Sequence, residues 1–423
     1  MKMLSMNRRW AVLFTIFLTA VLLRVGGNIA REKLFFHKPF LLSGNEYFKD
    51  FGCDSMWYDG TAKALLKGKG ISSISLNWYN EKNLGDEYVW IDHKRIDDTY
   101  YAHKAISPFY PIFLALCYYL WRASTLAYFI PHVIIGSLTC VFIYLLAEEV
   151  FNDTRIALTS ALAVAFYPDL VFWTYQVRTE TLFIFFLSLG FWFLIRGNAR
   201  QNTIFVLTSA VVFGLACLTR ETLIPFIPLL FLWQVFSGGK PAKERVKTGL
   251  SLMLIILAVL APWCGRNLLV FGKFTPFGDE VYAFLFHEGP DKVQEANYLC
   301  RSNKFLISRI FAFIANDPKA YALAFLERFI TFWSPYTALM KGLAKLYKGL
   351  TWLILFPLGF FGMAFLRKNW SRAGLLVIFI FYYSLLHAAS FVDSGLVYRY
   401  PIQPFICIFA AYGFCTIYEK VKR

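Results

Sequence analysis

Asp54 is the first side chain in the sequence whose type and setting suit acid–base chemistry. It precedes a stretch in which Tyr58, Ala62 and the Leu65-Leu66 pair recur at helical spacing, giving one apolar stripe. A carboxylate at this position can accept a proton from a substrate hydroxyl, or it can cap the N-terminus of the helix. Position alone favours the cap. We therefore keep both roles for Asp54, and one residue can serve both.

Glu180 is a second candidate carboxylate, at the start of a long apolar segment. Carboxylates at membrane depth are costly and are usually retained for function. Arg178 lies two residues earlier, so an ion pair with Arg178 would also explain the presence of Glu180. Both interpretations stay open from the sequence.

Four basic side chains lie near the same apolar segments and are suited to holding a phosphate group. His103 and Lys104 come just before a Pro-containing apolar stretch, 107–121, and Arg266 and Arg399 lie at the boundaries of apolar segments. Lysine binds phosphate as a point charge, whereas arginine can bind it through two N–H groups. A single boundary arginine can instead extend its charged end to the lipid headgroups. These residue types at these positions would allow any of the four to contact an anionic group.

Apolar segments that must position these side chains make up most of the chain. Of 423 residues, 58% are hydrophobic and 17% charged, and the mean hydropathy is +0.50, well above that of a soluble domain. Crossing a bilayer takes roughly 20 mostly apolar residues. The predicted spans are 10–29, 125–147, 155–173, 179–196, 203–219, 222–236, 248–263, 349–366, 373–391 and 401–418. The shorter segment 107–121 is predicted to be a helix lying in the outer interface. The fold class is therefore an all-α polytopic membrane protein.

The placement of basic residues predicts how these spans are oriented. The net charge is +16, and most of the excess Lys and Arg lies in the short connections and tails on one side of the predicted spans. This is the positive-inside pattern, which predicts cytoplasmic termini and places the long connections 30–106 and 264–348 outside. Because the pattern accounts for the charge, we expect no nucleic-acid partner.

Both long outer connections are predicted to lie over the membrane as lids. In the first, Gly68 and Gly70 should end the helix that follows Asp54. In the second, 303–315 is amphipathic, and Asp317-Pro318 has the pattern of a cap and first residue of a helix that runs to about Phe332.

The sequence gives no pattern typical of a metal site. The eight Cys show no zinc-type spacing, and Cys53 and Cys300, in the two outer connections, are either paired or free. The adjacent acids Asp97 and Asp98 are expected to be solvated. No cofactor and no obligatory metal are predicted.

Seven motifs, in order along the chain, resemble one family of membrane enzymes. They are DSMWYDGTAKALLKGKGIS (54–72), SPFYPIFLAL (107–116), FYPDLVFWTYQVRTETLF (166–183), GLACLTRETL (214–223), APWCGRNLLVFGKF (261–274), FIANDPKAYALAFLERFITFWSP (313–335) and YRYPIQPFICIFAAYG (398–413). The set resembles the GT-C membrane glycosyltransferases, in particular the protein-mannosyltransferase and aminoarabinose-transferase-like group, glycosyltransferase family 39 and its bacterial kin. Phe109 replaces the family's usual Gly, and Glu221 replaces its usual Pro. Each motif alone is weak, but the ordered set covers nearly the whole chain.

The resemblance implies a single GT-C-type domain over 1–423, with about ten transmembrane helices. It also implies transfer of a monosaccharide from a polyprenyl-phosphate donor to a lipid, glycan or protein acceptor. Asp54 would be the catalytic base, Glu180 a second catalytic carboxylate, and Tyr58 and Tyr110 part of the substrate pocket. The residues that would hold the donor phosphate are Lys104, His103, Arg266 and Arg399. The implied location is a bacterial or archaeal cell membrane, with the active site on the periplasmic or extracytoplasmic side.

Two other classes of protein fit parts of the sequence. A transporter or a flippase of lipid-linked sugars would explain the spans, but it should show short loops, charges near the midplane and internal repeats. A non-catalytic membrane scaffold would not require Asp54 and Glu180 at matching outer positions. The concentration of polar residues in the outer connections favours the transferase.

Overall fold

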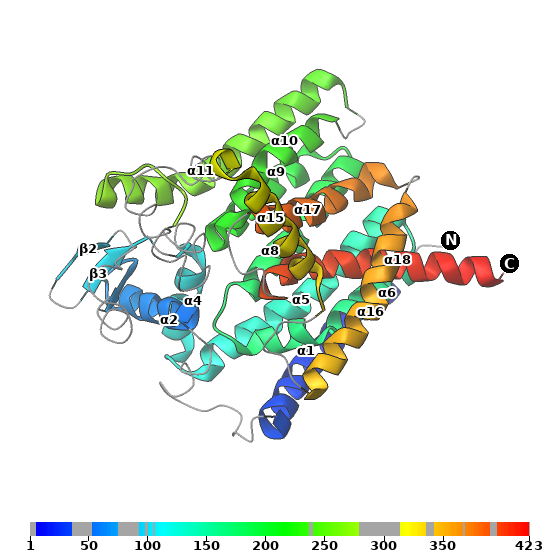
Figure 1. Cartoon of the computed structure of the whole chain (residues 1–423), viewed down its shortest axis with the longest axis horizontal. Coiled ribbons are helices and arrows are strands. Elements are labelled where there is room, and N and C mark those ends of the chain that lie inside the picture. Colours follow the sequence, from blue (N-terminus) through cyan, green and yellow to red (C-terminus); the bar gives the residue numbers. More distant parts are fainter. Residues whose placement is uncertain are drawn as a thin grey trace.

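The computed structural model of the chain describes residues 6–35, 53–74, 93–97, 100–104, 106–236, 240–278, 314–335, 342–366, 369–389 and 396–422. These residues form a helical bundle that carries a small sheet at one end (Figure 1). We call the end with the sheet the outer end, since it is built from the connection predicted to lie outside. Both chain termini lie toward the opposite, inner end.

The described elements follow the predicted order along the chain. The bundle helices are α1 (Met6–Phe35), α5 (Thr125–Phe151), α6 (Thr154–Ala165), α7 (Pro168–Phe172), α8 (Glu180–Ala199), α9 (Thr203–Thr219), α10 (Ile227–Phe236), α11 (Ala242–Phe271), α16 (Gly342–Ala364), α17 (Trp370–Ala389) and α18 (Gln403–Lys422). Short 3₁₀ turns are η2 (Trp173–Tyr175), η3 (Glu221–Phe226) and η6 (Leu396–Ile402). The outer elements are α2 (Cys53–Leu66), β1 (Ser72–Ile74), β2 (His93–Arg95), β3 (Tyr100–His103), α4 (Phe109–Trp121) and α15 (Pro318–Trp333).

The described helices confirm an integral membrane protein but not the count of ten spans. Six of them are long and apolar enough to cross a bilayer, and α6 with α7 makes a seventh if the bent pair counts as one span. That pair bends by 58° where 155–173 was predicted as one segment. Pro168 opens α7 after the break, because proline has no N–H to continue the preceding helix. Three further predicted spans correspond to shorter apolar helices of 10–17 residues: Thr203–Thr219 (α9), Glu221–Phe236 (η3 with α10) and Lys348–Ala364, the apolar part of α16.

Helix α11 extends further than its predicted span. It continues past the predicted end at residue 263 to Phe271, where Gly272 takes a left-handed conformation with φ 69° and ends it. Arg266 therefore lies on a helix and not in the second outer connection, which was predicted to begin at residue 264.

Two helices of the bundle approach each other closely because glycines line their contact. On α16, a Cβ added to Gly362 would overlap the backbone of Phe409 on α18. On α18, a Cβ on Gly413 would lie 2.5 Å from the carbonyl oxygen of Leu358. Small residues allow this kind of packing where the surrounding lipid provides no hydrophobic drive.

The outer end consists of α2, α4 and a three-stranded antiparallel sheet in the order β1-β3-β2. Gly68 and Gly70 have φ values of 71° and 65°, so both glycines follow the end of α2 as predicted. Helix α2 is held on α4 by Asp59, whose Oδ1 accepts a hydrogen bond of 2.8 Å from the Tyr118 hydroxyl. The Lys63 ammonium pairs with the same carboxylate at 2.7 Å.

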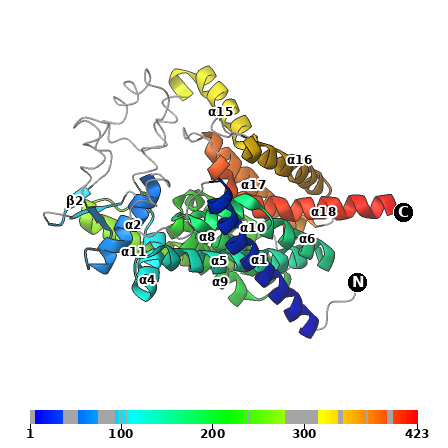
Figure 2. The ribbon, with the colours of Figure 1, turned by 90° about the horizontal axis from the view of Figure 1, so that it is seen from below.

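Helix α15, from the second outer connection, begins as predicted. The Oδ1 of Asp317 accepts a 2.9 Å hydrogen bond from the Ala320 N–H, so Asp317 is its N-cap. Figure 2 shows α15 and α16 along one side of the bundle. They are joined where the Trp352 indole N–H donates to the Trp333 carbonyl at 2.7 Å. Almost all of 303–315, together with Asp98 and Cys300, lies outside the described residues.

Candidate active site

The outer end of α8 carries a buried ion pair. Glu180 is the first residue of α8, and Arg220 directly follows the last residue of α9. The Arg220 Nη1 lies 2.9 Å from the Glu180 Oε1, and the Glu180 side chain is only 3% exposed. Arg178, the partner considered from the sequence, has its guanidinium 5.2 Å from the centre of the Trp173 ring. The chain thus pairs Glu180 with a cation from the neighbouring helix.

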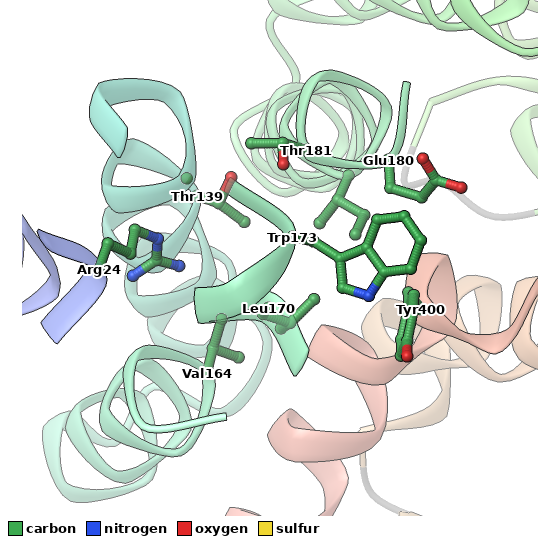
Figure 3. A pocket seen from close by; sticks show the side chains of 10 residues that line it. Arg24, Thr139, Val164, Leu170, Trp173, Glu180, Thr181 and Tyr400 are labelled. Carbon is green, nitrogen blue, oxygen red and sulfur yellow. The ribbon is translucent and has the colours of Figure 1, made fainter. Parts of the chain in front are cut away.

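The second oxygen of Glu180 retains its bonding capacity. The buried Oε2 accepts no hydrogen bond from any residue that the structure describes. Glu180 also borders a cavity, which Arg24, Thr139, Thr181, Trp173 and Tyr400 help to line. Figure 3 shows Arg24 and Glu180 on opposite sides of this cavity, with Trp173 between them. A carboxylate oxygen beside a cavity is available to a polar group that enters it.

Arg24 is a buried cation that the sequence analysis placed only within the first span. It is 1% exposed and donates to the Ala20 carbonyl at 3.2 Å and to the Cys140 Sγ at 3.6 Å. Its Nε has no partner among the described residues. The site exists because Gly136 has no side chain: a Cβ there would lie 2.6 Å from the Arg24 Nε. Its position inside a span could have marked Arg24 as a candidate.

The predicted pocket residues Tyr58 and Tyr110 meet each other beside Glu180. Their ring centres are 4.9 Å apart in an edge-to-face arrangement, and the Tyr110 hydroxyl lies 3.2 Å from the Nε2 of His132. Tyr110 and Arg220 both lie within electrostatic range of Glu180. We call Tyr58, Tyr110, His132, Glu180 and Arg220 the outer cluster. Sequence reasoning missed Arg220 and His132, although the Leu-Thr-Arg motif contained Arg220.

Asp54 lies on α2, the helix that also carries Tyr58. Asp54 is the second residue of this helix, one turn before Tyr58, which is consistent with the predicted helix start. Its side chain is outside the described residues. Its roles as base and as cap both remain predictions.

His103 and Lys104 lie at the end of β3 and are both buried. The His103 Nε2 is 3.1 Å from the Thr61 hydroxyl oxygen. Burial, with a smaller contribution from the charge of Arg266, lowers the pKa of His103 to about 3. His103 is therefore neutral at pH 7 and brings no charge to a phosphate. Lys104 is 1% exposed.

Arg266 ties the first outer connection to the bundle. Its Nη1 donates to the His103 carbonyl and its Nη2 to the Ile71 carbonyl, both at 2.9 Å. Its guanidinium also stacks 5.1 Å from the centre of the Trp263 ring. These bonds join α11 to the segment that carries His103 and Lys104.

Arg399 ties the second outer connection to the bundle. Its Nη1 donates to the carbonyls of Phe332 at 3.0 Å and Ser334 at 2.8 Å, at the end of α15. The Arg399 guanidinium lies 4.8 Å from the centre of the Phe356 ring. The structure thus does not gather Arg266, Arg399 and Lys104 around one described cavity, and each arginine holds a different outer segment.

Two further acids at the outer end were not predicted as site residues. Asp169, on α7, pairs with the Lys348 ammonium of α16 at 2.9 Å. Glu221, the departure from the usual Pro, accepts a hydrogen bond through Oε2 from the Gly278 N–H. Asp97, predicted to be solvated, forms a partly exposed ion pair with Lys69 at 2.8 Å. In the described parts of the chain, no three His, Cys, Asp or Glu side chains form a group able to hold a metal ion.

The fold is that of a GT-C membrane enzyme. Two solved structures of the oligosaccharyltransferase from Archaeoglobus fulgidus share it, one in complex with an inhibitory peptide and a dolichol-phosphate, the other tethered to an acceptor peptide containing the NVT sequon. Their TM-scores are 0.58 and 0.56, and each is 14% identical to this chain. They cover 97% and 98% of this chain, whereas the chain spans only 50% of either neighbour. At this identity the likeness shows the fold alone.

Part of the chain also matches a family of membrane glycosyltransferases. The family model described as dolichyl-phosphate-mannose-protein mannosyltransferase matches residues 104–265, less than half of the chain. These residues include Lys104, Tyr110, Glu180 and Arg220 but neither Asp54 nor Arg399. The match bears out the resemblance to the protein-mannosyltransferase family for the motifs that lie within it, 107–116, 166–183 and 214–223. A search of curated proteins found no match.

Proposed function

We propose that this chain is a membrane glycosyltransferase that moves a monosaccharide from a polyprenyl-phosphate donor to an acceptor at the outer end of the bundle. The family match over residues 104–265 and the GT-C fold support transfer from a lipid-linked sugar. The donor class also suits the neighbour bound to dolichol-phosphate. Such a donor keeps its tail in lipid and presents its sugar at the interface, where α2 and α4 lie.

The observation that carries the proposal is the outer cluster. Glu180 is buried, paired to Arg220 through one oxygen and left with a second oxygen beside a cavity. A purely structural ion pair gains nothing from spare bonding capacity, since an unpaired buried acceptor costs free energy. A substrate hydroxyl that donates to this oxygen would recover that cost. Aromatic rings at Trp173 and Tyr400 border the same cavity and suit the apolar face of a sugar.

In the proposed reaction, Asp54 is the general base. The acceptor hydroxyl loses its proton to the Asp54 carboxylate as its oxygen bonds to the anomeric carbon of the sugar. The bond between that carbon and the phosphate oxygen breaks, and the electron pair leaves with the polyprenyl phosphate. The products are the glycosylated acceptor and polyprenyl phosphate, and the proton is released from Asp54. Glu180 orients the reacting sugar or acceptor.

Lys104 is the cation that we assign to the leaving phosphate. A phosphate gains negative charge as the glycosidic bond breaks, and a cation at a partly dry interface stabilises that charge better than in bulk water. His103 precedes Lys104 in the chain and is neutral, so Lys104 is the charged residue of the two. Arg266 and Arg399 position outer segments through carbonyl bonds and have further N–H groups to offer a phosphate.

The replacement Asp54→Asn tests this function most directly. Asparagine caps helices as well as aspartate, so the change removes the base and spares the cap. In nanodiscs, with a panel of polyprenyl-phosphate hexoses and pentoses and lipid, glycan and peptide acceptors, the unchanged protein should release polyprenyl phosphate. The Asp54→Asn variant should lose at least about a hundredfold in this rate.

Asp97→Asn is the matched control in the same outer connection. Asp97 forms a partly exposed ion pair with Lys69, whose loss should leave the rate within about twofold. Normal turnover by a folded Asp54→Asn variant would reject Asp54 as the base. No release from any donor by the unchanged protein would reject the transferase itself.

A further inference from the structure

A second pocket lies at the opposite end of α8 from Glu180. It forms where α8 and α10 end and where α9 and α11 begin. The polar residues that line it include Asn198, Asn202, Gln234, Lys240, Arg245 and Thr248. From Glu180 to Asn198, α8 rises about 27 Å at about 1.5 Å per residue, close to the thickness of the hydrocarbon core. We call this the inner pocket, and it lies at the level of the second membrane interface.

The inner pocket is lined by cations and neutral polar groups. Lys240 and Arg245 line it, and no Asp or Glu does. The Lys240 ammonium donates to the neutral Thr203 hydroxyl at 2.7 Å, a bond that leaves the lysine charge uncompensated. The Nε of Arg245 is buried and has no hydrogen-bond partner among the described residues. Two cations thus line a recess in which the described residues place no carboxylate.

The neutral groups of the pocket are preorganised. Gln234 is 3% exposed, and its Oε1 accepts a 3.0 Å hydrogen bond from the Asn198 amide. Since this bond occupies the Gln234 oxygen, the amide nitrogen of Gln234 remains as a donor. Thr248 is also buried and lines the same recess. A recess with several donors and two cations suits the oxygens of a phosphate.

Exposed apolar side chains lie on the same helix ends that form the pocket and indicate where its phosphate comes from. Phe236, at the end of α10, is 77% exposed, and Ile204, at the start of α9, is 75% exposed. Exposed apolar residues on helix ends that also form a basic recess at an interface match a lipid, whose acyl chains and headgroup occupy adjacent zones.

We propose that the inner pocket binds the phosphate headgroup of an anionic phospholipid, held by Lys240 and Arg245. The site is separate from the outer cluster and does not depend on glycosyl transfer. With the topology predicted from the basic residues, the lipid belongs to the cytoplasmic leaflet. Bound there, the lipid would join the ends of four helices. Two of these lead to the outer cluster, since α8 begins with Glu180 and α9 is followed by Arg220.

The test compares two pairs of substitutions with the same charge change. Lys240→Gln with Arg245→Gln removes the cations of the pocket. Lys243→Gln with Lys247→Gln removes two exposed cations from the same first turns of α11. Native mass spectrometry of the detergent-purified full chain would count bound phosphatidylglycerol, with phosphatidylcholine and inorganic phosphate as the other ligands.

We expect phosphatidylglycerol to bind the unchanged protein more tightly than phosphatidylcholine. The pocket pair should weaken this binding about thirtyfold, since each basic residue near an anionic surface contributes about fivefold. The Lys243/Lys247 pair should change it less than about fivefold, and inorganic phosphate should not compete. Equal loss in both pairs, or equal binding of phosphatidylcholine, would overturn the site. Displacement by inorganic phosphate would identify a soluble phosphate ligand and overturn the lipid assignment.

Folding of the variants is checked by a charge-preserving pair. Lys240→Arg with Arg245→Lys keeps both cations and should keep most of the phosphatidylglycerol binding. If this pair binds normally and the Gln pair elutes as a monodisperse helical protein without bound lipid, the loss comes from charge. If the charge-preserving pair loses binding as fully as the Gln pair does, the recess recognises something other than an anion, and the proposal fails.

Discussion

The two ends of α8 each carry an ion pair between a glutamate and an arginine, and the pairs differ in the burial of the glutamate and in whether a cavity borders it. At the outer end, Glu180 and Arg220 are 2.9 Å apart. At the inner end, Glu149 and Arg196 are 3.0 Å apart. The Glu180 and Arg220 side chains are 3% and 17% exposed, whereas both side chains of the inner pair are 15% exposed. The two pairs therefore differ in the burial of the glutamate and not in the distance between the partners.

What separates them is where the remaining polar atoms lie. The Oε2 of Glu180 has no partner among the described residues and borders a cavity. At the inner end, Arg196 lies over the Trp192 ring at 5.3 Å, and its Nε is also buried without a partner among the described residues. Neither Glu149 nor Arg196 lines either of the two pockets described above, so the inner pair fits a role in holding helices together. The outer pair differs in keeping an unused acceptor beside a cavity.

The largest expected effect comes from neutralising one glutamate of each pair. Glu180→Gln should lower turnover about a hundredfold, because it removes a charged acceptor from the reacting groups. Glu149→Gln should leave turnover within about twofold, since a partly exposed pair contributes little. Both rates would be measured at saturating donor in nanodiscs. Equal effects at the two ends would remove the distinction between the pairs.

A smaller effect is expected from filling the space beside Arg24. In Gly136→Ala the new Cβ would meet the Arg24 Nε at 2.6 Å and the Thr174 Cγ2 at 3.1 Å. Such overpacking should cost about 1–3 kcal/mol of stability and lower the thermal midpoint. Gly26→Ala is the control on α1, because nothing lies within 4 Å of a Cβ at that position. A Gly136→Ala midpoint as high as that of Gly26→Ala would show that Arg24 moves freely.

Acidification should loosen the outer end before the inner end. Burial lowers the pKa of His103 to about 3 from its ordinary 6.5, so the folded outer segment that contains His103 disfavours protonation of its ring. The stability that neutral His103 contributes is present above about pH 6.5 and is lost as pH falls toward 3, by about 1 kcal/mol per pH unit. Hydrogen exchange of β3 and α2 peptides at about pH 5 and pH 7 would measure this. In His103→Gln the pH dependence of these peptides should disappear; if it persists, another group is responsible.

The assignment of outer and inner ends can be tested without changing activity. Single cysteines introduced by Lys82→Cys and Lys420→Cys should react with an impermeant maleimide on opposite sides of the membrane. The Lys82→Cys variant should be labelled in intact cells and the Lys420→Cys variant only after permeabilisation, with the parent chain correcting for native cysteines. The reverse pattern would exchange the two faces and place the inner pocket outside.

Local patterns in the sequence were sufficient for the helices. Apolar blocks predicted the bundle, because a backbone in lipid must satisfy its own hydrogen bonds and so forms helices. The end of α2 at Gly68 and the start of α15 at Asp317 were also predicted, since caps and left-handed glycines depend on a few neighbouring residues. The count of ten spans was not confirmed by length, because several apolar segments are short helices or bent pairs.

The partners of the charged side chains were decided by tertiary structure. Arg178 lies before the start of α8, and its guanidinium lies over the Trp173 ring, so its closeness to Glu180 in the sequence did not make it the partner. Arg220 comes from the next helix, and only the packing of α8 on α9 brings it within 2.9 Å. Likewise, boundary positions marked Arg266 and Arg399 as cations near the interface. Only the fold shows that each guanidinium binds carbonyls of an outer segment far away in the sequence.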